Sequence, residues 1–412
     1  MRKGDRVGIV LPQRVETAVA NIAVYKLGAV VLPLSVLFGR DALQFRLSDS
    51  GAKVVITDEL RAPFIQSIRE ELPDLHAVVG CRHGDEATEF WSLVDRSVGE
   101  FHPEVTRADD PAFLIYTSGT TGPPKGALSA HRAMLGHLPG FELSHDFFPQ
   151  PGDLMWTPAD WAWAGGLLDV LMPALYYGVP VLGVDSGKFD PERAFVLMEK
   201  YGVRSAFIPP TALKMMMQVP DAAERFDLRL RSIMSAGEQV GVEVLRWADD
   251  VLGVKVNEMW GQTEFNYLVG NCAELMPVKP GSMGRPYPGH DVVVIDADGD
   301  PVPDGEIGEL AAKQGDPVMF LGYWKNEQAT RAQCVGEWFR TGDTGYRDAD
   351  GYIWFVGRND DVISTAGHRV GPGEVEDCML KHAAVAQVAV IGSPDELLPA
   401  LLQLVPGGTL AL

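Results

Sequence analysis

A loop rich in glycine and hydroxyl side chains follows the apolar run AFLIY (112–116). The stretch YTSGTTGPPKGAL (116–128) combines hydroxyl donors, backbone N–H groups that glycine can turn toward one point, and the ammonium of Lys125. This set of donors suits a polyphosphate. A P-loop phosphotransferase is disfavoured, because Gly126 stands where the Walker A pattern needs Ser or Thr after the lysine. The loop is expected between a strand and a helix-like segment, and the alternative, an ordinary polar turn, explains fewer of these donors.

Two more polar stretches, SAGEQ (235–239) and NEMWGQTEF (257–265), each follow strand-like residues. Open α/β sheets bind ligands at the carboxyl ends of parallel strands, so we expect both stretches at such an edge. Glu264 is a candidate for holding Mg²⁺ on phosphate oxygens, and Trp260 is a candidate for stacking on a purine. Taken singly, a solvated carboxylate and a core tryptophan are the ordinary explanations.

The stretch FRTGDTG (339–345) contains Asp343, which its glycine and threonine neighbours place in a tight turn. A carboxylate there can accept two hydrogen bonds from ribose hydroxyls, or it can cap the turn. Together with the lysine loop and the two strand ends, it predicts a nucleotide site assembled from distant parts of the chain.

Short apolar runs alternate with helical patterns from the start, as in RVGIVL, VETAVANIAVYKLG and AVVLPL. This order predicts an α/β fold with two doubly wound, mostly parallel sheets, followed by a small β-rich, barrel-like unit and a partial α+β C-terminal domain. The large domain is expected over 1–358, with α/β halves at 1–150 and 151–284 and the β-rich unit at 285–357. A hinge is expected at 359–361, and a truncated mobile domain at 362–412.

The chain has 412 residues, and its 35 Lys and Arg against 56 Asp and Glu give a net charge of −21. That balance disfavours nucleic acid or an anionic membrane as the main partner. The four cysteines form no CxxC pair, which favours a reducing compartment and no zinc site. We see neither a signal peptide nor an apolar run of about 20 residues, so a cytoplasmic protein is expected.

The lysine loop, SAGEQ, NEMWGQTEF, FRTGDTG and GRNDDVISTAGHRVGPGEVE (357–376) occur in this order. The set resembles the AMP-forming adenylating superfamily, which includes acyl-CoA synthetases, luciferases and nonribosomal peptide adenylation domains. The resemblance covers nearly the whole chain and implies two half-reactions. A carboxylate attacks the α-phosphate of ATP to give an acyl-adenylate and pyrophosphate, and the thiol of CoA then takes the acyl group. The implied partners are therefore ATP, Mg²⁺, CoA and a small carboxylic acid.

The resemblance also implies residue roles. Lys125 and its loop hold the β- and γ-phosphates, Glu264 holds Mg²⁺, and Thr263 reaches the α-phosphate. The expected nucleotide-binding residues are Thr117, Ser118, Gly119, Thr120, Thr121, Gly122, Pro123, Pro124, Lys125, Gly237, Glu238, Gln239, Glu258, Met259, Trp260, Gly261, Gln262, Thr263, Asp343 and Arg358. Asp343 and Arg358 are the two that hold the ribose.

A moving C-terminal domain is the next implication. Asp360 stands at the family's pivot position, and the domain beyond it rotates between the half-reactions. Arg369 is expected to face phosphate or CoA, with a catalytic role, and the backbone at Ala366 and Gly367 to line the path of the pantetheine arm.

Six residues are expected to line the acyl pocket and so to limit the size of the acid: Trp161, Trp163, Ala164, Gly165, Ala236 and Gly261. Acetate-specific relatives carry larger residues at the last four of these positions. Since each buried methylene contributes about 0.8 kcal/mol, we expect a medium-chain, branched or aromatic acid in preference to acetate. Core packing is an equal alternative for the two tryptophans. Amino-acid-activating relatives place an aspartate at Ala164, and an ammonium buried without it would cost several kcal/mol, so an amino acid is disfavoured.

Both ends depart from the family pattern. Relatives continue before KGDRVGIVLP and after VAVIGSPDE, and they carry a lysine near the end that contacts the substrate carboxylate. Without that lysine we expect adenylation to be slower by about 10²–10³. Two alternatives follow: an impaired nucleotide-binding fragment, and an enzyme that transfers the acyl group to a carrier-protein thiol.

Overall fold

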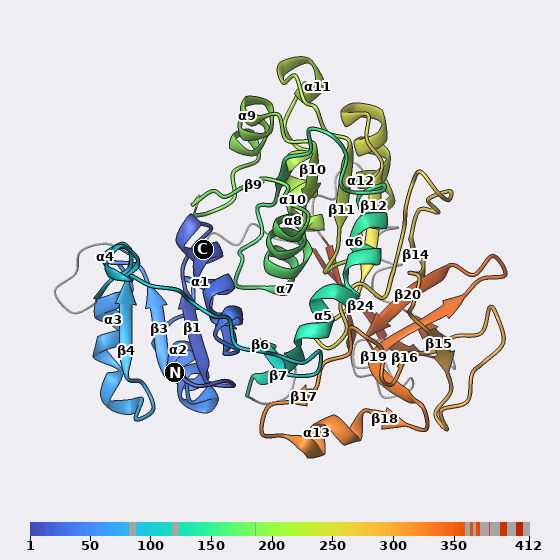
Figure 1. The fold of residues 1–412 in the computed structure, drawn as a ribbon. Helices are drawn as coiled ribbons and strands as arrows, with labels where there is room; N and C mark the ends of the chain where they lie inside the picture. Colours follow the sequence, from blue (N-terminus) through green and yellow to red (C-terminus); the bar gives the residue numbers. More distant parts are fainter. Residues whose placement is uncertain are drawn as a thin grey trace.

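The computed structural model describes residues 1–81, 88–117, 123–185 and 187–358, and beyond them residue 379 and four strand segments. Two large sheets dominate the described chain (Figure 1). The four later segments form two separate hairpins from strands β21 (Ile363–Thr365), β22 (His368–Val370), β23 (Val388–Ser393) and β24 (Leu401–Pro406).

The first sheet has eight strands in the order β17-β7-β6-β2-β1-β3-β4-β5. Its strands are β1 (Arg6–Val10), β2 (Val30–Pro33), β3 (Val54–Thr57), β4 (Ala77–Gly80), β5 (Thr88–Glu89), β6 (Pro111–Thr117), β7 (Lys125–Ala130) and β17 (Gly322–Tyr323). The strands from β6 to β5 pair in parallel, whereas β7 and β17 are antiparallel. The intervening helices are α1 (Val15–Lys26), α2 (Arg40–Ser50), α3 (Ala62–Ser67), η1 (Arg69–Glu71) and α4 (Phe90–Arg96).

The second sheet has twelve strands, and its first part is parallel. This part consists of β8 (Met155–Trp156), β9 (Val181–Leu182), β10 (Ser205–Phe207), β11 (Ser232–Ser235) and β12 (Val256–Trp260). The helices here are α5 (His131–Gly136), α6 (Leu138–Ser144), α7 (Ala164–Gly166), η2 (Leu167–Leu171), α8 (Met172–Tyr176), α9 (Pro191–Tyr201), α10 (Pro210–Met216), α11 (Ala222–Arg225), α12 (Val242–Trp247) and η3 (Ala248–Leu252).

Local chemistry explains these boundaries. Helix α9 begins after Asp190, whose carboxylate accepts the N–H groups of Glu192 at 3.0 Å and Arg193 at 3.2 Å. It ends at Gly202, which has a φ of +66°. Capped first turns and a left-handed glycine are the usual helix signals, and they match the predicted segment PERAFVLMEKYG.

Antiparallel strands continue the second sheet beyond β12, in the order β13, β14, β20, β19, β16, β15. They are β13 (Val269–Gly270), β14 (Ser282–Pro286), β15 (Val292–Ile295), β16 (Gly308–Lys313), β18 (Cys334–Val335), β19 (Trp338–Arg347) and β20 (Ile353–Arg358), with helix α13 (Glu327–Ala332). Strand β18 pairs with β19. The β-rich strands therefore extend the α/β sheet without a break; β16, β19 and β20 are orange in Figure 1.

The two predicted doubly wound sheets are confirmed, and so is the β-rich region. The position of strand β17 was not expected. It follows β16 of the second sheet in the chain, yet it pairs with β7 of the first sheet (Figure 1). The division into domains and a hinge remains a prediction.

The lysine loop does not join a strand to a helix, contrary to the sequence prediction. It joins β6 to β7, which pair antiparallel with Thr117 opposite Lys125. Helix α5 begins only after β7. The prediction failed because KGALSA contains small residues that suit a helix or a strand, and pairing with β6 and β17 decides between them.

None of the helices in the described residues has both the length and the apolar character needed to cross a bilayer.

Candidate functional site

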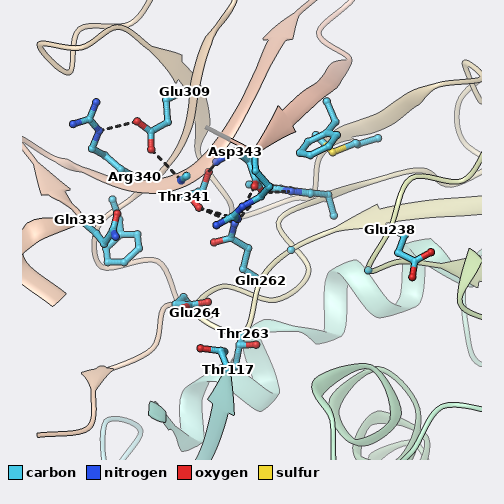
Figure 2. Close-up of a pocket in the computed structure, with 18 of the residues that line it drawn as sticks. Thr117, Glu238, Gln262, Thr263, Glu264, Glu309, Gln333, Arg340, Thr341 and Asp343 are labelled. Carbon is cyan, nitrogen blue, oxygen red and sulfur yellow. Dashed lines mark hydrogen bonds and ion pairs between the residues drawn. The ribbon is translucent and has the colours of Figure 1, made fainter. Parts of the chain in front are cut away.

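A cavity of about 1000 Å³ opens where the two sheets meet. Strands β6 and β7 supply one side of it, the ends of β11 and β12 supply another, and β19 and β20 supply the third. Figure 2 shows Thr117, Thr263 and Glu264 close together, with Asp343, Thr341 and Gln262 farther along the wall. Fourteen of the predicted site residues line this cavity: Thr117, Lys125, Gly237, Glu238, Gln239, Glu258, Met259, Trp260, Gly261, Gln262, Thr263, Glu264, Asp343 and Arg358.

Lys125 enters the cavity from the first residue of β7, directly opposite the last residue of β6. The hydroxyl of Thr117 donates to the carbonyl of Lys125 at 3.3 Å. The Lys125 ammonium lies 5.1 Å from the centre of the Tyr323 ring. Pro123 and Pro124 lie outside the cavity lining, and the predicted loop residues Ser118, Gly119, Thr120, Thr121 and Gly122 lie outside the described residues.

Thr263 and Glu264 lie just beyond the end of β12. The Tyr323 hydroxyl donates to Glu264 Oε1 at 2.6 Å, and the N–H of Phe320 donates to the Glu264 carbonyl at 2.9 Å. Burial, together with the Glu264 charge and hydrogen bond, raises the pKa of Tyr323 well above its ordinary value. Tyr323 is therefore a hydrogen-bond donor to this carboxylate.

The donor set fits Mg²⁺ only if phosphate completes it. The described residues contain no group of three or more His, Cys, Asp or Glu side chains able to hold a metal. Mg²⁺ is commonly bound by one or two carboxylates together with substrate phosphates and water. Glu264 is a carboxylate of this kind in the cavity wall.

Asp343 is the centre of a hydrogen-bond network at the other end of the cavity. Trp260 Nε1 and Gln262 Nε2 both donate to Asp343 Oδ2, at 3.0 and 2.9 Å. Arg358 Nη1 lies 2.7 Å from Asp343 Oδ1. Burial raises the pKa of Asp343, although Arg358 and the two hydrogen bonds act in the opposite direction. The Trp260 ring is thus fixed by its indole N–H, and it also belongs to a buried hydrophobic cluster with Phe265 and Leu268.

Asp343 does not lie in a tight turn, which corrects the sequence prediction. It lies within strand β19, where the register with β16 shifts between Glu309 and Ala311. Gly342 in this bulge has a φ of +75°, a conformation that favours glycine. Glu309 holds the bulge, because its Oε1 accepts the Gly342 N–H at 3.0 Å. A turn and a bulge share the same glycine-rich signal, and only the partner strand distinguishes them.

The residues after β11 form the remaining wall. Gly237 has a φ of +96°, and the Glu238 carboxylate accepts the hydroxyl of Thr211 at 2.7 Å. Within β12, Glu258 Oε1 accepts the N–H of Val240 at 3.4 Å, which connects the β11 loop to β12. Strands β11 and β12 pair in parallel, so the predicted position of both stretches at one sheet edge is confirmed.

The predicted acyl-pocket residues other than Gly261 lie outside this cavity lining. Trp161 is buried in the core of the first sheet, whereas Trp163 is 41% exposed and packs edge-on against Phe38. Ala164 and Gly165 begin α7, and Ala236 is buried beside β11. These residues do not line a common cavity among the described residues, and their assignment to an acyl pocket remains a prediction.

Two of these positions do not leave open space. A Cβ at Gly165 would lie 2.6 Å from Cε1 of the Phe207 ring. A Cβ at Gly261 would lie 2.8 Å from the Phe265 carbonyl and from the Tyr267 N–H. Neighbouring groups already occupy the space next to these two Cα atoms, so the argument that a missing side chain opens room stays a prediction here.

Several predictions fall in the C-terminal region. Asp360, Ala366 and Gly367 lie outside the described residues. Arg369 lies in β22, where its backbone pairs with Ser364.

Sequence reasoning missed part of the cavity wall. The additional lining residues are Met283, Glu309, Tyr323, Ala332, Gln333, Phe339, Arg340, Thr341, Gly342 and Phe355. Phe339 to Gly342 belong to FRTGDTG and were within reach of the motif. Tyr323 had no local signal, because its role depends on the long-range pairing of β17 with β7.

Comparison with known proteins agrees with this geometry. Residues 1–324 match the family model described as AMP-binding enzyme. The chain is 36% identical to acetyl-coenzyme A synthetase of Bacillus subtilis (strain 168), over 96% of this chain and 69% of that protein. It is 31% identical to the mitochondrial acyl-coenzyme A synthetase ACSM3 of Mus musculus, over 96% and 68%. The crystal structure of the anthranilate CoA ligase AuaEII in complex with anthranoyl-AMP matches with a TM-score of 0.90 and 28% identity, over 98% of this chain and 77% of that one. The chain therefore belongs to the AMP-binding enzyme family, as an AMP-forming ligase of the acyl-CoA synthetase kind.

Proposed function

We propose that the protein joins a carboxylic acid larger than acetate to CoA in two steps, through an acyl-adenylate. The observation that carries this proposal is the convergence of Lys125, Trp260 and Asp343 on one cavity of about 1000 Å³. These residues come from three separate parts of the chain, and they offer an ammonium, an aromatic face and a buried carboxylate. A nucleoside triphosphate has a matching partner for each.

In the first step, an oxygen of the acid attacks the α-phosphorus of ATP and pyrophosphate leaves. The barrier falls when the reactants are held in line and the charge on the leaving group is matched by fixed donors. In this proposal Lys125 attracts the β- and γ-phosphates, and Thr263 donates to the α-phosphate. Asp343 accepts the ribose hydroxyls in this proposal. When bound to Glu264 and the phosphates, Mg²⁺ supplies additional positive charge.

In the second step, the CoA sulfur attacks the acyl carbon and AMP leaves. We assign the hinge at 359–361, with Asp360 as the pivot, and the backbone at Ala366 and Gly367 to the pantetheine path. Arg369 is assigned to phosphate or CoA. These roles are supported by the family resemblance of GRNDDVISTAGHRVG.

The preference for a medium-chain, branched or aromatic acid is supported by the small residues Ala164 and Ala236. A structural relative whose complex holds anthranoyl-AMP also supports an aromatic acid. The acetyl-CoA synthetase relative makes acetate the necessary comparison. We also propose a cytoplasmic location, supported by the free thiols of Cys81, Cys272 and Cys334.

Pyrophosphate release, measured with acetate, butyrate, hexanoate, isobutyrate and benzoate, tests the first step. Mass spectrometry of the products with CoA present tests the second step. We expect acyl-CoA with hexanoate or benzoate at a higher kcat/KM than with acetate. Acetate as the best substrate would overturn the preference. ATP binding without any acyl-adenylate would favour an impaired nucleotide-binding protein, and acyl-adenylate without acyl-CoA would point to a carrier-protein thiol.

The role of Lys125 has a matched control in Lys313, which lies on an exposed strand end and pairs with Asp291 at 3.4 Å. We expect Lys125→Ala to slow adenylation by about 10²–10³, the usual effect of losing one preorganised charge contact. Lys313→Ala should keep the wild-type rate. Equal rates for both variants would refute the assignment of the lysine loop to phosphate.

A further inference from the structure

Tyr323 lies between two elements that are distant in sequence. Strand β17, which contains Tyr323, pairs antiparallel with β7, and Tyr323 stands opposite Ala127. Two backbone hydrogen bonds extend this pairing, from the Trp324 N–H to the Gly126 carbonyl at 2.7 Å and from the Leu321 N–H to the Leu128 carbonyl at 2.6 Å. The backbone of Tyr323 is therefore fixed next to the strand that carries Lys125.

The Tyr323 side chain contacts both charged residues of the phosphate end. Its hydroxyl donates to Glu264 Oε1 at 2.6 Å, and its ring faces the Lys125 ammonium at 5.1 Å. A cation within about 6 Å of an aromatic ring centre is attracted to the ring. One side chain thus holds a carboxylate by its polar end and an ammonium by its face.

The position of Tyr323 is itself tightly determined. Its N–H donates to the hydroxyl of Thr330 at 2.9 Å, and its ring packs edge-on against Phe320 with centroids 5.1 Å apart. The N–H of Phe320 in turn donates to the Glu264 carbonyl at 2.9 Å. The segment around Tyr323 therefore holds both the backbone and the carboxylate of Glu264.

We propose that Tyr323 is a positioning residue, which orients the Glu264 carboxylate toward phosphate-bound Mg²⁺ and holds the Lys125 ammonium beside it. This inference rests on the proposed function. The hydrogen bond from the Tyr323 hydroxyl to Glu264 Oε1 already fixes the orientation of the carboxylate. Binding of a cation to the second oxygen, Oε2, therefore costs little additional side-chain entropy. Among the residues that the structure describes, Oε2 accepts no hydrogen bond, so it is the oxygen available to a cation.

The ring and the hydroxyl make separate contacts, so two substitutions distinguish their contributions. Tyr323→Phe removes only the hydroxyl bond to Glu264, and Tyr323→Leu also removes the ring beside Lys125.

The test measures ATP affinity by isothermal titration calorimetry with the full chain and no acid, so that no turnover occurs. Each protein is titrated once with excess Mg²⁺ and once with EDTA. Tyr352→Phe is the matched control, because the Tyr352 hydroxyl donates to the Pro277 carbonyl at 2.7 Å away from the cavity lining. Thermal melting confirms that each variant is folded.

For Tyr323→Phe we expect ATP affinity to fall about tenfold in Mg²⁺ and to stay within about twofold in EDTA, since the lost bond is to a charged group. Tyr323→Leu should weaken ATP binding in EDTA as well, and Tyr352→Phe should match the wild type in both conditions. The Mg²⁺ concentration needed for half-maximal pyrophosphate release should rise in parallel.

An equal loss in Mg²⁺ and EDTA would overturn the inference, because it would indicate a structural role alone. Unchanged or tighter Mg²⁺-dependent binding would also overturn it, since the hydroxyl would then compete with the cation. If the wild type itself binds no ATP in either condition, the proposed function fails together with this inference. If the wild type binds Mg²⁺–ATP and Tyr323→Phe binds it equally well, only this inference fails.

Discussion

Asp343 and Arg358 are cross-strand partners: they stand opposite each other in β19 and β20, and their side chains form an ion pair of 2.7 Å at the cavity wall. Strand pairing, and not sequence proximity, therefore sets the distance between the carboxylate and the guanidinium. The same carboxylate accepts hydrogen bonds from the side chains of Trp260 and Gln262, at and just beyond the end of β12. Strands β19 and β20 and the end of β12 therefore meet at one side chain.

Asp343→Asn should weaken ATP binding by about 10–100-fold, because hydrogen bonds to a charged group contribute about 1.5–3 kcal/mol. The fold should tolerate the change, since Asn keeps an oxygen that accepts from Trp260 and Gln262, and the Arg358 side chain is about half exposed to water. Titration with ATP and thermal melting check the two parts. Asp304→Asn, which alters an exposed pair with Arg347, is the control and should change neither. Wild-type ATP affinity in Asp343→Asn would remove Asp343 from the site.

Glu309→Ala should raise the KM for ATP and lower the free energy of unfolding by about 1–3 kcal/mol, because the half-buried Gly342 N–H loses its acceptor. Arg340 loses its partner at 2.8 Å in the same change. Steady-state kinetics and urea unfolding measure the two effects. Glu327→Ala, which breaks an exposed pair with Arg331 on α13, should leave both values unchanged. A loss of stability with an unaltered KM would show that the bulge does not aim Asp343 at the nucleotide.

Gly165→Ala should destabilise the protein by about 1–3 kcal/mol, since the added Cβ forces the Phe207 ring to move. If the acyl group lies beside α7 as proposed, the KM for benzoate should rise while the KM for ATP stays constant. Melting temperatures and kinetics with both substrates provide the measurement. Gly39→Ala serves as the control for the added methyl alone, because a Cβ there meets no atom within 4 Å and its φ of −73° suits any residue. A parallel rise in both KM values would argue against an acyl pocket at this place.

Stability should decrease as the pH falls from 6.5 toward 3, partly through His145. Burial, helped by the Arg231 charge, lowers the pKa of this imidazole from 6.5 to about 3. Between these values the unfolded chain binds the proton and the folded chain does not, so acidification favours unfolding. Thermal melting of His145→Gln across this pH range should show a shallower decline than the wild type.

His102→Gln is the control for this titration, because the side chain of His102 is 87% exposed. It should reproduce the wild-type slope. Burial also lowers the pKa of His137 to about 3. We therefore expect His137 and His145 to share the loss of stability at acidic pH. An identical slope in His145→Gln and the wild type would show that His145 does not contribute to acid sensitivity.

The sequence alone was sufficient for the alternation of strands and helices and for the edge at which SAGEQ and NEMWGQTEF lie. The reason is that burial period, helix caps and turn residues act over a few neighbouring positions. The short motifs are also local in sequence, and their order along the chain identified most of the residues that line the cavity.

Only the tertiary structure decided that the lysine loop is a hairpin, that Asp343 lies in a bulge and that Tyr323 meets Glu264. Each of these features depends on which strand lies next to which, and such pairings join residues far apart in the chain, 59 positions in the case of Tyr323 and Glu264. A short segment such as GYW has no periodicity that reveals its partner strand. The physical reason is that backbone hydrogen bonding and side-chain packing, which the whole fold settles together, override weak local preferences.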